Sequence, residues 1–136
     1  MTETTRSVAG RPAYERLEAW AACHALTKAV YVATGNWPAS ERFGLSSQVR
    51  RAAWSATASI AEGSAKRGPR EFARFLDVAN GSVSEVRYGL RLAAELGYVP
   101  REDGERLDQL LQSASRLTWC LYRSIRRAAT HPRMTA

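Results

Sequence analysis

Residues 71–96 decide the fold, and their sequence is EFARFLDVANGSVSEVRYGLRLAAEL. Apolar side chains recur in it at spacings of three and four over more than three heptads, which is the period of one face of an α-helix. That stripe consists of Phe72, Phe75, Leu76, Ala79, Val83, Val86, Leu90 and Ala93. A helix with one continuous apolar face has to bury it, so this segment predicts a helix over residues 70–96 packed in a core.

Breaks that combine glycine with proline separate this helix from three other segments. The breaks are Gly35-Asn36-Trp37-Pro38, Gly68-Pro69 and Gly97-Tyr98-Val99-Pro100. The flanking segments predict helices over residues 14–34, from residue 40 or 45 to 66, and over 102–128. The second segment spaces Leu45, Val49, Ala52, Ala56, Ile60 and Gly63 by three and four, and the last does the same with Leu107, Leu110, Leu111, Ala114, Leu117, Leu121 and Ile125. Sustained period-two alternation is absent, so a sheet is not predicted.

Four helices joined by short connections predict an all-α fold, an antiparallel up-down-up-down four-helix bundle. The bundle domain is expected over residues 12–129, with residues 1–11 and 130–136 as flexible tails. The first helix carries two adjoining apolar stripes, which indicates neighbours on two sides. Four tryptophans also exceed what the core of a thin bundle needs, namely Trp20, Trp37, Trp54 and Trp119. We therefore expect a homo-oligomer.

The net charge is +7 and the isoelectric point is near 10.1, with 18 arginines and only two lysines among the 136 residues. Such a balance favours a polyanionic partner, although a merely solvated basic surface would have the same composition.

Cys23 and Cys120 belong to no ligand or disulfide motif, and we expect both to be buried as small apolar residues. Because no apolar run is long enough to span a bilayer and the opening residues lack a signal-peptide pattern, we expect a cytoplasmic protein without membrane contact.

Several motifs then resemble one known family. They are Leu17-Glu18-Ala19-Trp20 with His24, residues 43–53 (FGLSSQVRRAA), Ile60-Ala61-Glu62-Gly63, residues 71–76 (EFARFL), residues 79–85 (ANGSVSE) and Leu96-Gly97-Tyr98. In this order they are similar to the 23S ribosomal RNA intervening-sequence proteins, over about Tyr14 to Ala128. The sequence departs from that family at Thr57, Ser59 and Trp54, and these departures predict a straighter second helix.

The resemblance implies a four-helix protomer with a basic surface that assembles into a ring, commonly a homopentamer. The sequence is also similar to the accessory variability protein of diversity-generating retroelements. That protein works alongside a reverse transcriptase and its RNA. A reverse transcriptase or another protein is therefore a further candidate partner. The resemblance defines the fold more sharply than the cellular role.

Residues for catalysis are sparse. His24 follows Trp20 by one helical turn, which is typical of a packed and hydrogen-bonded histidine, and His131 falls in the expected tail. Cys23 and His24 point about 100° apart on a helix, so no metal site is predicted. No phosphate-cradling glycine motif is present, so no cofactor is predicted. Glu62 and Glu85 lie on polar stripes with arginines, which indicates a charge-paired seam between helices or subunits more than an acid-base pair. We expect no enzyme.

The informative pattern is basic. One cluster surrounds the turn between the second and third helices. A second lies later in the third helix, where two arginines are again one helical turn apart. The third lies along the last helix, interleaved with Trp119 and Tyr122. The candidate nucleic-acid-binding residues are Lys66, Arg67, Arg70, Arg74, Arg87, Arg91, Arg116, Arg123, Arg126 and Arg127. Guanidinium groups beside aromatic rings suit phosphate pairing with base stacking. Acids such as Glu71, Asp77 and Glu85 could instead neutralise part of this set.

The sequence thus favours a non-enzymatic basic homo-oligomer that binds RNA or DNA electrostatically as an accessory or scaffold protein. No helix-turn-helix, zinc finger or RNA-binding sheet motif is present, so the expected contacts are to the backbone. The alternative is a protein-interaction module whose basic face docks an acidic protein, without direct contact to nucleic acid.

Overall fold

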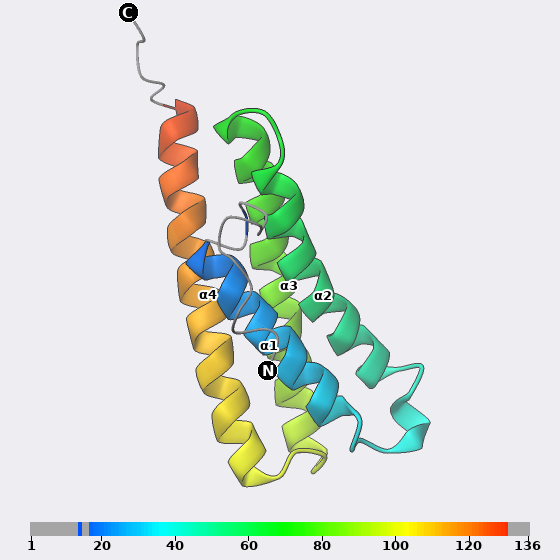
Figure 1. Cartoon of the computed structure of the whole chain (residues 1–136). Helices are drawn as coiled ribbons and strands as arrows, with labels where there is room; N and C mark the ends of the chain where they lie inside the picture. Colours follow the sequence, from blue (N-terminus) through cyan, green and yellow to red (C-terminus); the bar gives the residue numbers. More distant parts are fainter. Residues whose placement is uncertain (1–13, 15–16, 131–136) are drawn as a thin grey trace, which may run out of the picture.

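The structure, a computed structural model, describes residue 14 and residues 17–130, which form four α-helices (Figure 1). The helices are α1 (Glu18–Thr34), α2 (Leu45–Ser64), α3 (Pro69–Glu95) and α4 (Arg101–Thr130), and a short 3-10 helix, η4 (Ala39–Glu41), lies between α1 and α2. The described residues contain no strand, so the predicted all-α class is confirmed. The expected tails 1–11 and 131–136, with His131, lie outside the described residues, and Thr130 belongs to α4.

Each helix packs against the next one in the chain, and α1 also packs against α4. Arg50, early in α2, donates a hydrogen bond to the hydroxyl oxygen of Thr34 at the end of α1, with Nε and Oγ1 2.6 Å apart. Late in α3, Gly89 lies against Val49 near the start of α2. The α2–α3 turn and the end of α4 lie together at the top of Figure 1, and the other two connections lie at the bottom.

The core runs along the space between the helices. Its largest fully buried side chains are Cys23, Leu26, Val30, Val49, Ile60, Leu76, Val86 and Thr118. The apolar stripes predicted for α2 and α3 therefore face the core. On α4 the predicted stripe is fully buried only at Leu107, Leu111 and Ala114, whereas Leu117, Leu121 and Ile125 are partly buried. Packing consequently loosens toward the end of α4.

The first helix begins later than the sequence pattern suggests, and the second begins at the later of its two predicted starts. The first begins at Glu18, because Leu17 has an extended backbone with ψ of 126°, and Tyr14 belongs to a 3-10 turn before it. The second begins at Leu45, because Gly44 has φ of −110° and ψ of −110°, outside the helical region. The Glu41 carboxylate accepts a hydrogen bond from the Leu45 backbone N–H at 3.2 Å, which satisfies one free donor of α2.

Glu41 also joins the two lower connections. Its other carboxylate oxygen accepts a hydrogen bond from the Tyr98 hydroxyl at 2.8 Å, and this bond raises the pKa of Tyr98 above its usual value. The Tyr98 ring lies 6.1 Å from the ring of Trp37, which is buried. Gly97, just after the end of α3, has φ of +81°, a conformation that turns the chain out of the helix. The Tyr98 N–H donates a hydrogen bond back to the Ala93 carbonyl at 2.9 Å.

The tryptophans divide between core and surface. Trp37 is buried in the protomer, so the prediction that it exceeds the needs of the core is wrong. Trp54 and Trp119 are 63% and 51% exposed, and Trp20 is partly buried. The exposed tryptophan surface of the protomer therefore consists mainly of Trp54 and Trp119.

The α2–α3 contact is the closest in the bundle, and glycine makes it possible. A Cβ atom on Gly63 would lie 2.6 Å from the Phe75 Cβ atom, and one on Gly89 would collide with Val49 Cγ2. At Gly81, on the exposed face of α3, a Cβ atom would meet no atom within 4 Å. These glycines test the packing against a control on the same helix.

We predict that Gly89→Ala destabilises the protein by about 1–3 kcal/mol, because the added methyl group overpacks the α2–α3 contact. The control Gly81→Ala should instead stabilise it by about 0.5–1 kcal/mol, because alanine is the better helix former at an open position. Urea unfolding followed by circular dichroism at matched protein concentration measures both changes. Equal effects of the two substitutions would contradict the close packing.

The two cysteines differ in burial. Cys23 is buried beside Thr118, with its Sγ atom 3.3 Å from the hydroxyl oxygen, and burial raises the pKa of its thiol. Cys120 is exposed on α4, so the prediction that both cysteines are buried is wrong for Cys120. Thr118 is buried in the core, and Cys120, two residues later, lies about 200° further round the helix and so points outward.

We predict that a thiol reagent labels one cysteine per folded chain rapidly. Cys120 should react because it is exposed, whereas Cys23 should react only on unfolding because it is buried and its thiolate is disfavoured. Mass spectrometry after timed alkylation identifies the labelled residue, and Cys120→Ser should abolish the rapid phase. Rapid labelling of Cys23 in the folded protein would contradict the packing of α1 on α4.

Candidate nucleic-acid interface

The charge of α4 is divided between its two halves. From Leu110 to Thr130 the helix carries four arginines and no aspartate or glutamate. These are Arg116, Arg123, Arg126 and Arg127, all exposed. From Arg101 to Gln109 it carries two arginines and four acids. The basic charge therefore lies on the half of α4 that ends beside the α2–α3 turn.

An aromatic pair lies within this acid-free half. Trp119 and Tyr122 are stacked, with ring centroids 5.5 Å apart and planes inclined by 28°. Arg126 Nη1 donates a hydrogen bond to the Tyr122 hydroxyl at 2.8 Å, which holds its guanidinium beside the rings. Of the predicted mixture of guanidinium groups and aromatic rings on α4, Trp119, Tyr122 and Arg126 are therefore in contact.

The cluster predicted around the turn between the second and third helices lies at and after the α2–α3 turn. Its residues Lys66, Arg67, Arg70 and Arg74 are all exposed. The Lys66 ammonium lies 5.4 Å from the centre of the Phe75 ring, and the Arg74 guanidinium lies 4.8 Å from it. Arg74 also forms an ion pair with Glu71 at 3.2 Å. Hydrogen bonding across this pair lowers the pKa of Glu71 and raises that of Arg74.

The two clusters meet at one end of the bundle. Residues from the start of α3 and the end of α4 line a common hollow: Arg70, Glu71, Ala73, Arg74, Asp77, Tyr122, Arg126, Ala129 and Thr130. We define the basic pole as Lys66, Arg67, Arg70, Arg74, Arg123, Arg126 and Arg127. Glu71 and Asp77 lie within its hollow, so the pole is not uniformly basic.

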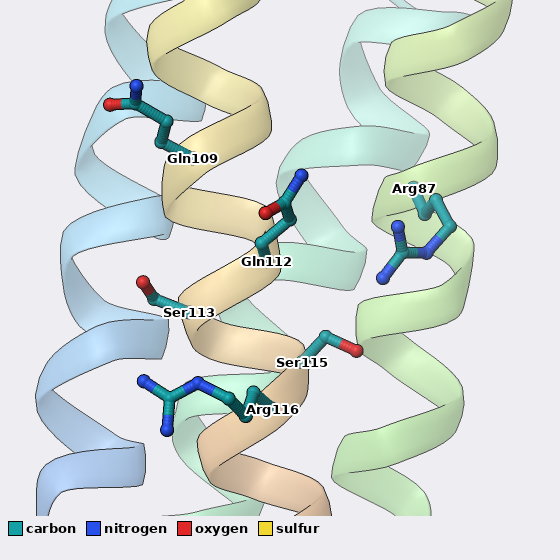
Figure 2. A pocket seen from close by; sticks show the side chains of 6 residues that line it. All are labelled: Arg87, Gln109, Gln112, Ser113, Ser115 and Arg116. Carbon is teal, nitrogen blue, oxygen red and sulfur yellow. The ribbon is translucent and has the colours of Figure 1, made fainter.

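The remaining candidates lie further along the bundle. Arg87 of α3 lines an open hollow with Gln109, Gln112, Ser113, Ser115 and Arg116 of α4. Figure 2 shows Gln112 and Ser115 on the side of α4 that faces Arg87, whereas Gln109, Ser113 and Arg116 extend on the side nearer α1. Arg87 and Arg116 are thus not brought together. Arg91 forms an ion pair with Glu95 at 3.1 Å.

Acids neutralise few of the candidate arginines. Among the described residues the ion pairs join Arg74 to Glu71, Arg91 to Glu95 and Arg101 to Glu105, each within one helix. In that part of the chain no ion pair links two helices, so the charge-paired seam predicted around Glu62 and Glu85 is not formed within the protomer. Its α2–α3 stripe instead contains a hydrogen bond from the Ser82 hydroxyl to that of Ser55, at 3.0 Å.

The residues considered for catalysis do not converge. Gly63, next to Glu62, contacts Phe75 near the basic pole, whereas Glu85 lines a hollow with Leu45 and Gln48 at the start of α2. His24 stacks on Trp20 with ring centroids 4.7 Å apart, and it is exposed where we expected a packed side chain. Over residues 14 and 17–130, no three His, Cys, Asp or Glu side chains gather closely enough to hold a metal ion.

One feature of the interface was visible in the sequence without being singled out. The acid-free stretch of α4 can be counted directly, and it distinguishes this helix from α3, where four arginines accompany four acids. Gln112 and Ser115 were also missed, because nothing in their sequence context separates them from ordinary exposed polar residues.

Within the described residues no helix is both long and apolar enough to cross a membrane.

Comparison with known proteins identifies one family. No curated protein matches the chain significantly. The description of the matching family is 23S rRNA-intervening sequence protein, and the match extends over residues 15–119. It ends at Trp119, earlier than the resemblance to Ala128 noted in the sequence, so Tyr122, Arg123, Arg126 and Arg127 lie beyond it. Because residues 15–119 make up well over half of the sequence, the chain belongs to the 23S rRNA-intervening sequence protein family.

Proposed function

We propose that this protein works by binding nucleic acid, with the basic pole and Arg116 neutralising backbone phosphates as part of an accessory or scaffold role. The observation that supports the proposal is the acid-free half of α4, which ends beside the arginines that begin α3. Exposed arginines of this kind can exchange their counterions for phosphates, and the release of those counterions drives binding. The proposed role requires no catalytic group.

The arginines of α4 have a competing structural explanation. Positive side chains near a helix C-terminus interact favourably with the helix dipole, but this effect is confined to about the last turn. Only Arg127 lies in the last turn of α4. Arg116 precedes the end of the helix at Thr130 by more than three turns. The dipole therefore accounts for one of the four arginines, which leaves the others for a partner.

The ion pairs at the interface leave the arginines accessible. Both partners of the Arg74–Glu71 pair are substantially exposed, with side-chain exposures of 63% and 47%. Exposed pairs of this kind contribute little to stability, so a phosphate can displace the carboxylate at little cost. Arg74 can therefore take part despite its pairing.

We predict steep salt dependence. If the assembled protein makes six to ten phosphate contacts, its affinity for a nonspecific oligonucleotide should fall by about 10³- to 10⁵-fold between about 50 and 200 mM salt. The double substitution Arg123→Gln and Arg127→Gln should reduce the slope of log affinity against log salt by about one unit per lost contact. Fluorescence anisotropy across a salt series measures both quantities.

The matched control is Arg101→Gln with Arg106→Gln, which removes two charges from the acidic half of the same helix. This variant should retain most of the wild-type slope, since only net charge has changed. Equal losses in the two double variants would contradict the placement of the interface. A protein partner that stays bound after nuclease treatment, with no oligonucleotide binding at about 50 mM salt, would favour the docking of an acidic protein.

We also propose that the protomer is an antiparallel up-down-up-down bundle that assembles into a homo-oligomeric ring, with a pentamer favoured. The contacts between opposite helix ends support the topology. Large apolar side chains left exposed on the single chain support the assembly, since burying them against a second chain is favourable. They include Tyr31, Val32, Phe43, Trp54, Val78, Tyr88 and Leu96.

Light scattering of the purified protein should therefore give a mass that is a multiple of the 15.0 kDa chain, about 75 kDa for a pentamer. The measurement should be repeated at two protein concentrations, because a cyclic assembly that saturates its interfaces keeps one size. A mass of about 15 kDa at both concentrations would contradict the assembly while leaving the fold of the protomer intact.

A further inference from the structure

We infer that the groove between α3 and α4 binds single-stranded RNA or DNA in preference to duplex, with Trp119 as a stacking platform for one base. This inference rests on the nucleic-acid binding proposed above and adds the class of substrate. It depends on three observations about the described residues: the partial exposure of the Trp119 ring, the polar residues on either side of it, and the position of the acids.

Trp119 is held in place and partly open. Its ring packs against Tyr122, yet the residue is 51% exposed on a helix surface. Exposing an indole ring of this size to water is unfavourable, so an aromatic partner that covers it gains binding energy. The flat face of a nucleobase is such a partner, and base stacking on aromatic side chains tolerates any base.

The polar surroundings of Trp119 suit a nucleic-acid strand. Trp119 lies four residues after Ser115, which faces Arg87, and three residues before Tyr122, whose hydroxyl holds Arg126. Residues at these spacings share one face of a helix, so the platform lies between the two hollows of the groove. A strand along α4 from Gln112 to Arg126 would cover about 21 Å, with a guanidinium beyond each side of the stacked base.

The acids of the groove indicate where the strand runs. Glu71 and Asp77 line the hollow at the basic pole from the α3 side, and Asp77 has no ion-pair partner among the described residues. On the α4 side the residues from Leu110 to Thr130 carry no acid. Phosphates therefore follow the α4 side of the groove, which is also the side that carries Trp119.

Stacking, not charge, produces the preference for single strands. Phosphates occur in both forms, so arginine contacts alone bind duplex as well as single strands. Inside a duplex each base face is covered by its neighbours, and exposing one requires unpairing, which is unfavourable. A single strand presents base faces without that cost. The ratio of the two affinities therefore reports on the platform, independently of the electrostatic attraction.

The experiment compares a labelled oligothymidylate of about 20 nucleotides with a blunt duplex of the same length, so that both exceed the roughly 4 to 16 nucleotides that single-strand sites cover. Trp119→Ala should weaken binding of the single strand by about 5- to 150-fold, the loss of one stacked base, and leave duplex binding within about twofold. Trp119→Phe should retain most of the preference, because it keeps an aromatic face. Anisotropy titrations at about 50 mM salt measure each affinity.

The matched control is Trp54→Ala, which removes an indole of similar exposure from α2 and should leave the ratio of the two affinities unchanged. An unchanged ratio in Trp119→Ala would overturn the inference. A change of particle mass on Trp119→Ala, measured by light scattering, would also overturn it by assigning Trp119 to a contact between subunits. Failure of the wild-type protein to bind either oligonucleotide would overturn the proposed function itself.

Discussion

The structure depends on the close approach of α2 to α3. Gly63 and Gly89 let the two backbones come near enough for Phe75 and Val49 to fill the space that a side chain would otherwise occupy. The alanines on α2 add to the same effect, because small side chains keep the two axes near each other. Since α1 and α4 pack against this pair, the turn at Lys66 and Arg67 is presented where the end of α4 can lie beside it. The arrangement of the basic residues is thus a result of helix packing.

The interface and the fold involve different parts of the chain. The fully buried side chains of α4 lie before Trp119, whereas Leu121 and Ile125 only border the core. Three of the four arginines of its acid-free half follow Trp119, where the match to the 23S rRNA-intervening sequence protein family ends. Membership of the family therefore explains the bundle and says little about these arginines.

The sequence predicted the helices well because their apolar stripes are long and regular. The stripe from Leu76 to Ala93 needed no tertiary information, and neither did the breaks at Gly68 and Gly97. Details that depend on contacts between distant segments were beyond it. Trp37 belongs to the core because Tyr98 and the lower connections enclose it, and Cys120 is exposed because it lies roughly opposite the buried Thr118 on α4. At the candidate interface, the types of residue were predictable, but the separation of Arg87 from Arg116 on different sides of α4 was not.

The two halves of α4 differ in charge, since one is acidic and the other basic, and this difference contributes an electric dipole along the helix. In a cyclic assembly the symmetry operation carries every basic pole to the same rim of the ring. Like charges on such a rim repel one another, and dissolved ions relieve that repulsion by screening. In the proposed ring, raising the ionic strength should therefore tighten the contacts between subunits while weakening the proposed binding of a polyanion. The two equilibria would respond to salt in opposite directions, although both originate in the same arginines.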